Sequence, residues 1–215
     1  MGFLTHFAFF LAATSVVTAD VAAPANAPKV TSVTYSGSGC ANNAKFSGTF
    51  NDPTLTFSTF AASLPGNQTV NCQVHIQASG TSPGWQVAVN RNVVKGHLVL
   101  APGTSLTHYT TIYYSQDAAR TVSWRLSKRH PGIELLTASA QDSFTGTITN
   151  SDSDTFNDAI TLVGKADADR VWSPCTGDTG YTGILNINFR GALSGDGKAY
   201  FEANTEEWDL VWRKC

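Results

Sequence analysis

The sequence predicts an all-β protein in which antiparallel strands stack as a sandwich. Apolar and polar residues alternate with a period of two in segment after segment. Pro-Gly pairs separate many of these segments, and no window of twelve or more residues carries the i, i+3, i+4 apolar stripe of a helix. Strands with one apolar face bury it by packing sheet against sheet. We therefore expect a jelly-roll-like antiparallel β-sandwich of roughly ten strands.

The alternating segments follow one another along most of the chain. They are residues 30–35, 55–60, 72–77, 84–90, 105–115, 121–127, 143–149, 184–189 and 207–212. In the segment CQVHIQ, the apolar residues share one face, and Gln73, His75 and Gln77 share the other. The separators include Pro65-Gly66 and Pro102-Gly103, which are typical turn pairs. One domain over 29–215 accounts for the whole pattern.

The N-terminus has the organisation of a secretory signal peptide. An apolar run extends from Phe7 to Val17, which is too short to span a bilayer. It ends in Val17-Thr18-Ala19, small residues at the spacing that signal peptidase accepts. We expect a signal peptide over 1–19, an extended leader over 20–28, and a protein of the secretory pathway lumen or the exterior. The alternative is a buried N-terminal helix.

The cysteines predict two disulfides. Four cysteines in an oxidising compartment pair as two bridges, and no C-x-x-C pair indicates zinc. Spacing does not choose among the three possible connectivities. We favour Cys40–Cys72 and Cys175–Cys215, since each closes a loop of a few tens of residues. Asn67 begins the N-Q-T glycosylation sequence within a predicted turn.

Charge and motifs exclude several classes of function. A net charge of −2 and a pI near 6.2 give no reason to expect nucleic acid or an anionic membrane as partner. The sequence lacks phosphate-loop, Rossmann, G-x-S-x-G and H-E-x-x-H motifs, so we expect no cofactor. A glycosidase is left open as an alternative, because two distant strands could supply its pair of carboxylates. The histidines lack metal-ligand spacing, and we expect no metal. Asp152, Asp154 and Asp158 leave a loose calcium loop as an alternative, although the EF-hand pattern fails.

Four residues are candidates for lining an apolar pocket. His108 shares its strand face with Leu106 and Tyr114, so its imidazole is expected to point inward. Tyr114, Trp124 and Arg125 supply the aromatic walls and a second hydrogen-bond donor. Their catalytic roles, if any, are not assigned. The alternative for each aromatic residue is ordinary core packing.

The chain resembles a family of secreted fungal proteins. The segments SGSGC, NCQVHIQ, GWQVAV, KGHLVLAPG, VWSPC, ILNINF and the terminal WRKC occur here in that order. The family is known only as a domain of unknown function, number four-three-six-zero, and the resemblance extends from about Lys29 to Cys215. It implies a signal peptide, an all-β domain and disulfides that join the cysteines in sequential pairs.

Size, secretion and the lack of cofactor motifs also resemble the fungal hetero-Diels–Alderases of tropolone–sesquiterpene biosynthesis. This likeness implies a cofactor-independent cyclase that holds a hydrophobic polyketide or terpenoid partner in a dry cavity. The alternative function is a non-catalytic cell-wall or host-interface protein that binds glycans or a protein. The outward Tyr113 and the Asn- and Thr-rich strand faces favour this alternative.

Overall fold

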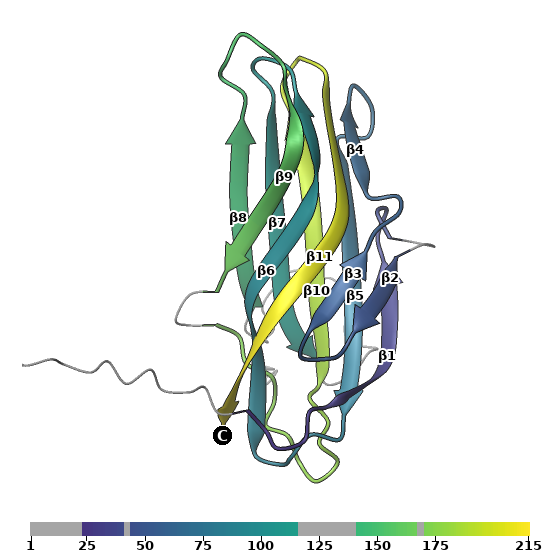
Figure 1. Cartoon of the computed structure of the whole chain (residues 1–215), viewed down its shortest axis with the longest axis vertical. Coiled ribbons are helices and arrows are strands. Elements are labelled where there is room, and N and C mark those ends of the chain that lie inside the picture. The colour runs from purple at the N-terminus through teal and green to yellow at the C-terminus, as the bar shows by residue number, and fades with distance from the viewer. Residues whose placement is uncertain (1–22, 41–43, 116–140, 167–169) are drawn as a thin grey trace, which may run out of the picture.

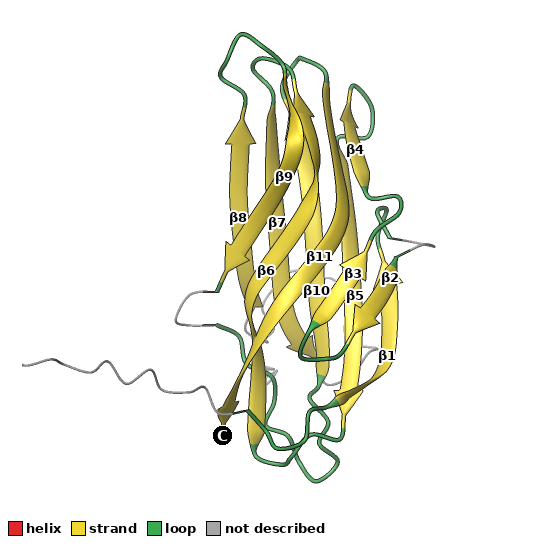
Figure 2. Cartoon of the chain, viewed as in Figure 1, coloured by secondary structure: helices red, strands yellow, loops and turns green. Residues whose placement is uncertain are grey.

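The computed structural model describes residues 23–40, 44–115, 141–166 and 170–215. Within these ranges the chain forms eleven strands and no helix (Figures 1 and 2). The strands make two antiparallel sheets that pack face to face. The predicted all-β sandwich is confirmed.

Sheet A has five strands in the order β1-β5-β10-β7-β8. Their bounds are β1 Lys29–Ser36, β5 Thr69–Ser79, β10 Ile184–Ser194, β7 Ser105–Ser115 and β8 Gln141–Thr149. Sheet B has the order β2-β3-β11-β6-β9, and β4 also pairs with β11. Its bounds are β2 Lys45–Gly48, β3 Pro53–Thr56, β4 Ala61–Leu64, β11 Ala199–Lys214, β6 Trp85–Leu100 and β9 Phe156–Lys165.

The chain crosses repeatedly from one sheet to the other. Strand β5 of sheet A leads to β6 of sheet B, and β6 leads back to β7. The same alternation joins β8, β9, β10 and β11, and sheet B faces the viewer in Figure 1. Such crossings are typical of jelly rolls. They place β8 and β9, the last strands of their sheets, at the same edge of the sandwich.

Strands β6 and β11 form the longest ladder, and two β-bulges interrupt it. One lies between Ala203 and Thr205, and the other between Asp209 and Leu210. At the first bulge the strands come very close, since a Cβ on Gly96 would lie 2.0 Å from the carbonyl oxygen of Glu202. Only glycine fits at such an approach. Each bulge shifts the alternation of side chains by one residue.

Aromatic side chains from both sheets fill the core. Phe60 lies between Phe189 of sheet A and Phe201 of sheet B, at ring-centroid distances of 5.1 and 6.1 Å. Trp208 and most apolar residues of β5 and β10 are also buried. Each fully buried Phe or Leu contributes roughly 2 kcal/mol of hydrophobic stabilisation. The alternation read from the sequence thus produces the inner faces of both sheets.

Both predicted disulfides are confirmed. Cys40–Cys72 joins the segment after β1 to β5, and Cys175–Cys215 joins the segment before β10 to the end of β11. Each sheet therefore carries one bridge. Two disulfides are typical of a protein from an oxidising compartment.

Three details extend or correct the sequence analysis. The Asp- and Ser-rich loop is shorter than its sequence suggests, because β9 begins at Phe156. The segment expected over 121–127 lies outside the described residues.

The described part of the leader packs on the sandwich, with Pro24 and Pro28 buried and Thr81 Oγ1 donating to the carbonyl oxygen of Asn26 at 2.7 Å. In the part of the chain that the structure describes, no helix is long and apolar enough to cross a membrane.

Candidate functional site

His108 lies at the open edge of the sandwich, between β8 and β9. It is half-buried and lines a pocket of about 240 Å³ together with Phe144, Gly164 and Lys165. Burial lowers the pKa of His108. Gly146 of β8 lets the ring approach, since a Cβ there would lie 2.4 Å from His108 Nε2. The pocket is open to solvent and mainly polar.

Tyr114 lies farther along β7 and deeper in the molecule. It is buried, and among the described residues its hydroxyl has no hydrogen-bond partner. Burial raises the pKa of this phenol far above its usual range. Six residues of strand separate it from His108, which corresponds to about 20 Å. The two side chains therefore do not share one pocket.

The remaining predicted positions are Trp124, Arg125 and Asn67. Trp124 and Arg125 lie outside the described residues, so their part in a pocket remains a prediction. Asn67 is exposed in the loop between β4 and β5, and its glycosylation likewise remains a prediction.

The described acidic residues before and at the start of β9 do not form a metal-binding cluster. Asp152, Asp154 and Asp158 line an open pocket of about 540 Å³. Among the described residues, no group of three or more His, Cys, Asp or Glu side chains could hold a metal ion. The calcium alternative thus gains no support from this loop.

A buried carboxyl group lies between the sheets, where the sequence analysis expected only apolar side chains. Glu206 Oε1 accepts hydrogen bonds from Asn92 Nδ2 at 2.5 Å and Trp208 Nε1 at 3.0 Å, while Oε2 has no partner. Burial raises the pKa of Glu206 to about 7, although the two donors lower it. Because the group is 1% exposed, it cannot meet a large ligand without opening the core. We therefore expect Glu206 to influence the folding stability of the protein and its dependence on pH.

The outer face of sheet A carries rows of polar side chains, of which Asn186 is buried. Strands β5, β10 and β7 lie side by side, and their register aligns the outward residues in rows. The rows are His75–Asn186–Tyr113, Gln73–Asn188–Thr111 and Asn71–Arg190–Tyr109. At the alternate positions these three strands point inward with mostly apolar residues, and Thr110 of β7 is a buried polar exception. We call these nine residues the amide face.

Hydrogen bonds fix one end of the amide face. Gln73 Nε2 donates to Tyr113 Oη at 2.6 Å across β10. Asn186 is fully buried, and its Nδ2 donates to Ser115 Oγ at 3.1 Å and to the carbonyl oxygen of Ile184 at 3.0 Å. Its Oδ1 lies 2.5 Å from His75 Nδ1. Because an amide oxygen only accepts, His75 donates from Nδ1 and its Nε2 is left as an acceptor.

The other end of the amide face is more exposed. Tyr109 is 38% exposed, and the Arg190 guanidinium lies 6.0 Å from its ring centroid. Arg190 is the one Lys, Arg, Asp or Glu residue among the outward positions of β5, β7 and β10. Asn188 Oδ1, in the middle row, is a buried acceptor without a partner.

Uncharged hydrogen-bonding groups make up most of the amide face. It presents uncharged donors and acceptors beside tyrosine rings, and its described residues include no carboxylate pair of the kind that glycosidases use. The sequence did indicate part of it, because Gln73 and His75 were placed outward. Asn186 and Asn188 were not singled out, although ILNINF shows them at alternating positions.

Comparison with known proteins gives weak structural similarities. One is to the carbohydrate-binding module TmCBM61 in complex with β-1,4-galactotriose, at 11% identity over 87% of this chain and 91% of that chain, with a TM-score of 0.25. Another is to the enzymatically active domain of bacteriophage CBA120 tailspike protein 4, at 11% identity over 85% of this chain but 19% of that chain, with a TM-score of 0.21. These scores are too low to support an inference about function.

Sequence comparison is more decisive about the family. No curated protein matches the chain. The profile of the domain of unknown function DUF4360 matches residues 26–215, which is nearly all of the chain outside the predicted signal peptide. The chain therefore belongs to the DUF4360 family.

Proposed function

We propose that this protein is a non-catalytic secreted protein that binds a neutral cell-wall glycan on the amide face. The observation that carries the proposal is the alignment of amide, imidazole and phenol groups on three adjacent strands. Sugar hydroxyls both donate and accept hydrogen bonds, and Asn and Gln side chains offer both functions. Tyrosine rings supply flat apolar area for the faces of the sugar rings.

The internal hydrogen bonds of the amide face favour binding further. Gln73 and Tyr113 hold each other in place, and the buried Asn186 holds His75, so less side-chain entropy is lost when a ligand is bound. The near absence of charge favours a neutral chain over an acidic one. We therefore expect retention to be almost independent of salt between low and about 0.5 M NaCl.

Retention on insoluble polysaccharide tests the proposal. The mature protein is mixed with chitin or β-glucan, and bound protein is measured after washing. We expect retention on one of them, and Tyr109→Ala and Gln73→Ala to weaken it about tenfold each by removing a ring and an amide. Lys95→Gln, on the outer face of sheet B, is the matched control and should bind as the parent does.

Two results would contradict this function. One is no retention of the parent protein on either polysaccharide. The other is equal retention of the parent and of the Tyr109→Ala, Gln73→Ala double variant, which would place binding elsewhere.

The compartment belongs to the same proposal. Cleavage after Ala19 would start the mature chain at Asp20, and Asn67 would carry an N-linked glycan. Mass spectrometry of the protein secreted by a eukaryotic host checks both points. A retained residue 1–19 segment would refute the cleavage.

A cofactor-independent cyclase of the hetero-Diels–Alderase type is the second candidate, and one observation favours it. The Tyr114 hydroxyl is a buried donor without a partner in the described ranges, of the kind that could stabilise a quinone-methide oxygen. Against it, the three pockets formed by described residues at β6, β8 and β9 are open and polar. Incubation with a tropolone quinone-methide precursor and a humulene-type alkene tests it. Product formed no faster or more selectively than in buffer would end this candidate, and Tyr114→Phe should slow a true cyclase.

A further inference from the structure

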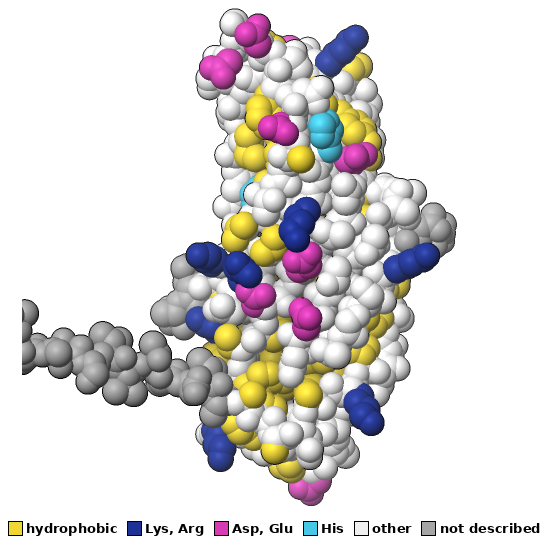
Figure 3. Space-filling model, in the orientation of Figure 1, with side chains coloured by type: hydrophobic (Ala, Val, Ile, Leu, Met, Phe, Trp, Pro, Cys, Tyr) yellow, Lys and Arg dark blue, Asp and Glu magenta, His cyan; other side chains and the backbone are white. Residues whose placement is uncertain are grey.

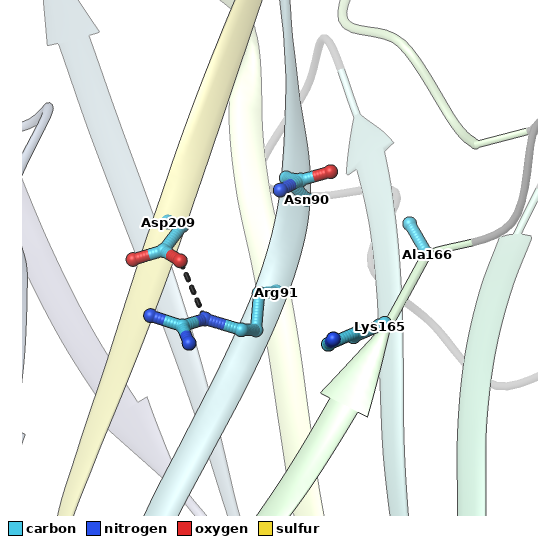
Figure 4. A pocket seen from close by; sticks show the side chains of 5 residues that line it. All are labelled: Asn90, Arg91, Lys165, Ala166 and Asp209. Carbon is cyan, nitrogen blue, oxygen red and sulfur yellow. Dashed lines mark hydrogen bonds and ion pairs between the residues drawn. The ribbon is translucent and has the colours of Figure 1, made fainter.

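A second polar site lies on the opposite side of the sandwich, at the end of β9. Its pocket has a volume of about 360 Å³ and is lined by Asn90, Arg91, Lys165, Ala166 and Asp209 (Figure 4). The residues come from β6, β11 and the end of β9, and none of them belongs to the amide face.

A β-bulge turns Asn90 into this pocket. Arg91 pairs with Asp209 and Val89 pairs with Leu210, so Asn90 is the extra residue of β6. Bulges of this kind re-aim a side chain and are frequent beside binding sites. The carbonyl oxygen of Asn90 accepts from Ala166 N at 2.8 Å, which ties the bulge to the chain after β9.

Arg170 determines which end of the Asn90 amide is available. Its Nη1 donates to Asn90 Oδ1 at 2.9 Å, so the Nδ2 group is left as a donor. Arg170 also lies 6.0 Å from the Trp172 ring, on which the Arg213 guanidinium stacks at 4.1 Å. The amide orientation is thus supported by a layer of positively charged and aromatic side chains.

Two positive charges lie directly opposite each other in the pocket. Arg91 of β6 pairs in register with Lys165 of β9. Like charges at opposite positions of a strand pair repel each other and destabilise the sheet. Asp209 forms an ion pair with only one of the two positive charges, since its Oδ2 accepts from Arg91 Nε at 2.6 Å. Within the described residues the Lys165 ammonium group has no hydrogen bond or ion pair, and Asp167 and Asp169 lie outside them.

The arrangement has one place for an anion and one for a hydroxyl group. In the part of the chain that the structure describes, Lys165 Nζ and Asn90 Nδ2 are donors without an acceptor, and the second oxygen of Asp209 is an acceptor without a donor. The described lining residues include two cations and one carboxylate, so their charges sum to +1, and a single carboxylate would neutralise this charge. A sugar acid offers a carboxylate and hydroxyl groups on one ring.

We propose that this pocket binds the carboxylate of a uronic acid unit in an acidic polysaccharide. Lys165 and Asn90 hold the carboxylate, and Asp209 accepts a hydrogen bond from a neighbouring hydroxyl. The site is independent of the amide face, so the protein would hold a neutral glycan on one side and an acidic one on the other.

Calorimetric titration of the mature protein with galacturonic acid oligomers tests this proposal at low salt. We expect binding that weakens at least tenfold when the oligomers are methyl-esterified, because the ester removes the charge and keeps the ring. Lys165→Gln should weaken binding of the acid about tenfold. Lys95→Gln removes a lysine from the same face that is already paired with Glu207, and should change nothing.

The outcomes separate this site from the amide face. Tyr109→Ala should leave uronate binding intact, whatever it does to retention on neutral polysaccharide. Equal binding of acid and ester, or equal binding by the parent and Lys165→Gln, would overturn the proposal. Displacement of the oligomer by inorganic phosphate at equal concentration would also overturn it, since the pocket would then recognise charge alone.

Discussion

The two outer faces of the sandwich differ in the side chains that they expose to solvent. The amide face of sheet A is almost uncharged, and its side chains bond to one another. The outer face of sheet B carries cross-strand ion pairs, Arg91–Asp209 and Lys95–Glu207, and its charged residues are spread over the surface in Figure 3. Both sheets are antiparallel and bury their inner faces, so the fold class alone does not determine whether an outer face is charged or uncharged.

The difference between the two faces indicates which side-chain interactions are costly to replace. Exposed ion pairs are weak and easily replaced, because water screens both partners. A buried amide such as Asn186 is costly to replace, because its removal leaves other groups unsatisfied. We therefore expect the uncharged, internally bonded face to be the more rigid of the two, and the charged face to tolerate substitution better. Four predictions sharpen this contrast.

The disulfides should produce the largest effect, and an equal one in the two sheets. The bridges span 32 and 40 residues, and loops of this size correspond to about 4 kcal/mol each in the chain-entropy estimate. Cys40→Ser/Cys72→Ser and Cys175→Ser/Cys215→Ser should thus lower the free energy of unfolding similarly. Urea unfolding of both double variants measures it. A loss confined to one pair would show that the sheets differ in more than their outer faces.

The second prediction concerns the one acidic side chain on the inner face of sheet B. The pKa of Glu206 rises from 4.5 to about 7 on folding, so the folded state binds a proton that the unfolded state releases. Stability from this group is complete below pH 4.5, falls between pH 4.5 and 7, and stays low above pH 7. The total loss is about 3 kcal/mol.

Urea unfolding at pH 4 and pH 9 tests this dependence. Glu206→Gln keeps acceptors for Asn92 and Trp208 but cannot ionise, so its stability should vary much less over this range. Glu207→Gln, one residue along on the outer face, is the control and should retain the parent's dependence. The same pH profile for the parent and Glu206→Gln would refute the assignment.

Sequence patterns predicted the layers of this molecule better than its polar details. Alternation in CQVHIQ and ILNINF predicted which residues of β5 and β10 point inward, because a regular strand turns every second side chain to the same face. Glu206 was missed because the bulge after Ala203 shifts the parity of β11 and turns the carboxyl inward. The parity of EWDLVW, which places Trp208 and Leu210 inward, was the available clue. The pocket at Asn90 depends on another bulge and on pairing across three strands, which one sequence does not reveal.

The third prediction tests the amide face through its buried member. Asn186→Ala removes the partner of His75 and of Ser115 and should cost about 2 kcal/mol of unfolding free energy. Thr145→Ala, at an exposed position of the same outer face on β8, should stay within about 0.5 kcal/mol of the parent. Urea unfolding measures both variants. Equal effects would mean that the hydrogen bonds of the amide face contribute no more than ordinary surface contacts.

The smallest effect is expected on the outer face of sheet B. Lys95 Nζ lies 2.9 Å from Glu207 Oε1, and the side chains are 53% and 40% exposed. A double-mutant cycle with Lys95→Ala and Glu207→Ala should therefore give a coupling of about 0.5 kcal/mol or less, which decreases further in 1 M NaCl. A coupling as large as the cost of Asn186→Ala would reverse the contrast between the faces, because the charged surface would then be the more tightly constrained of the two.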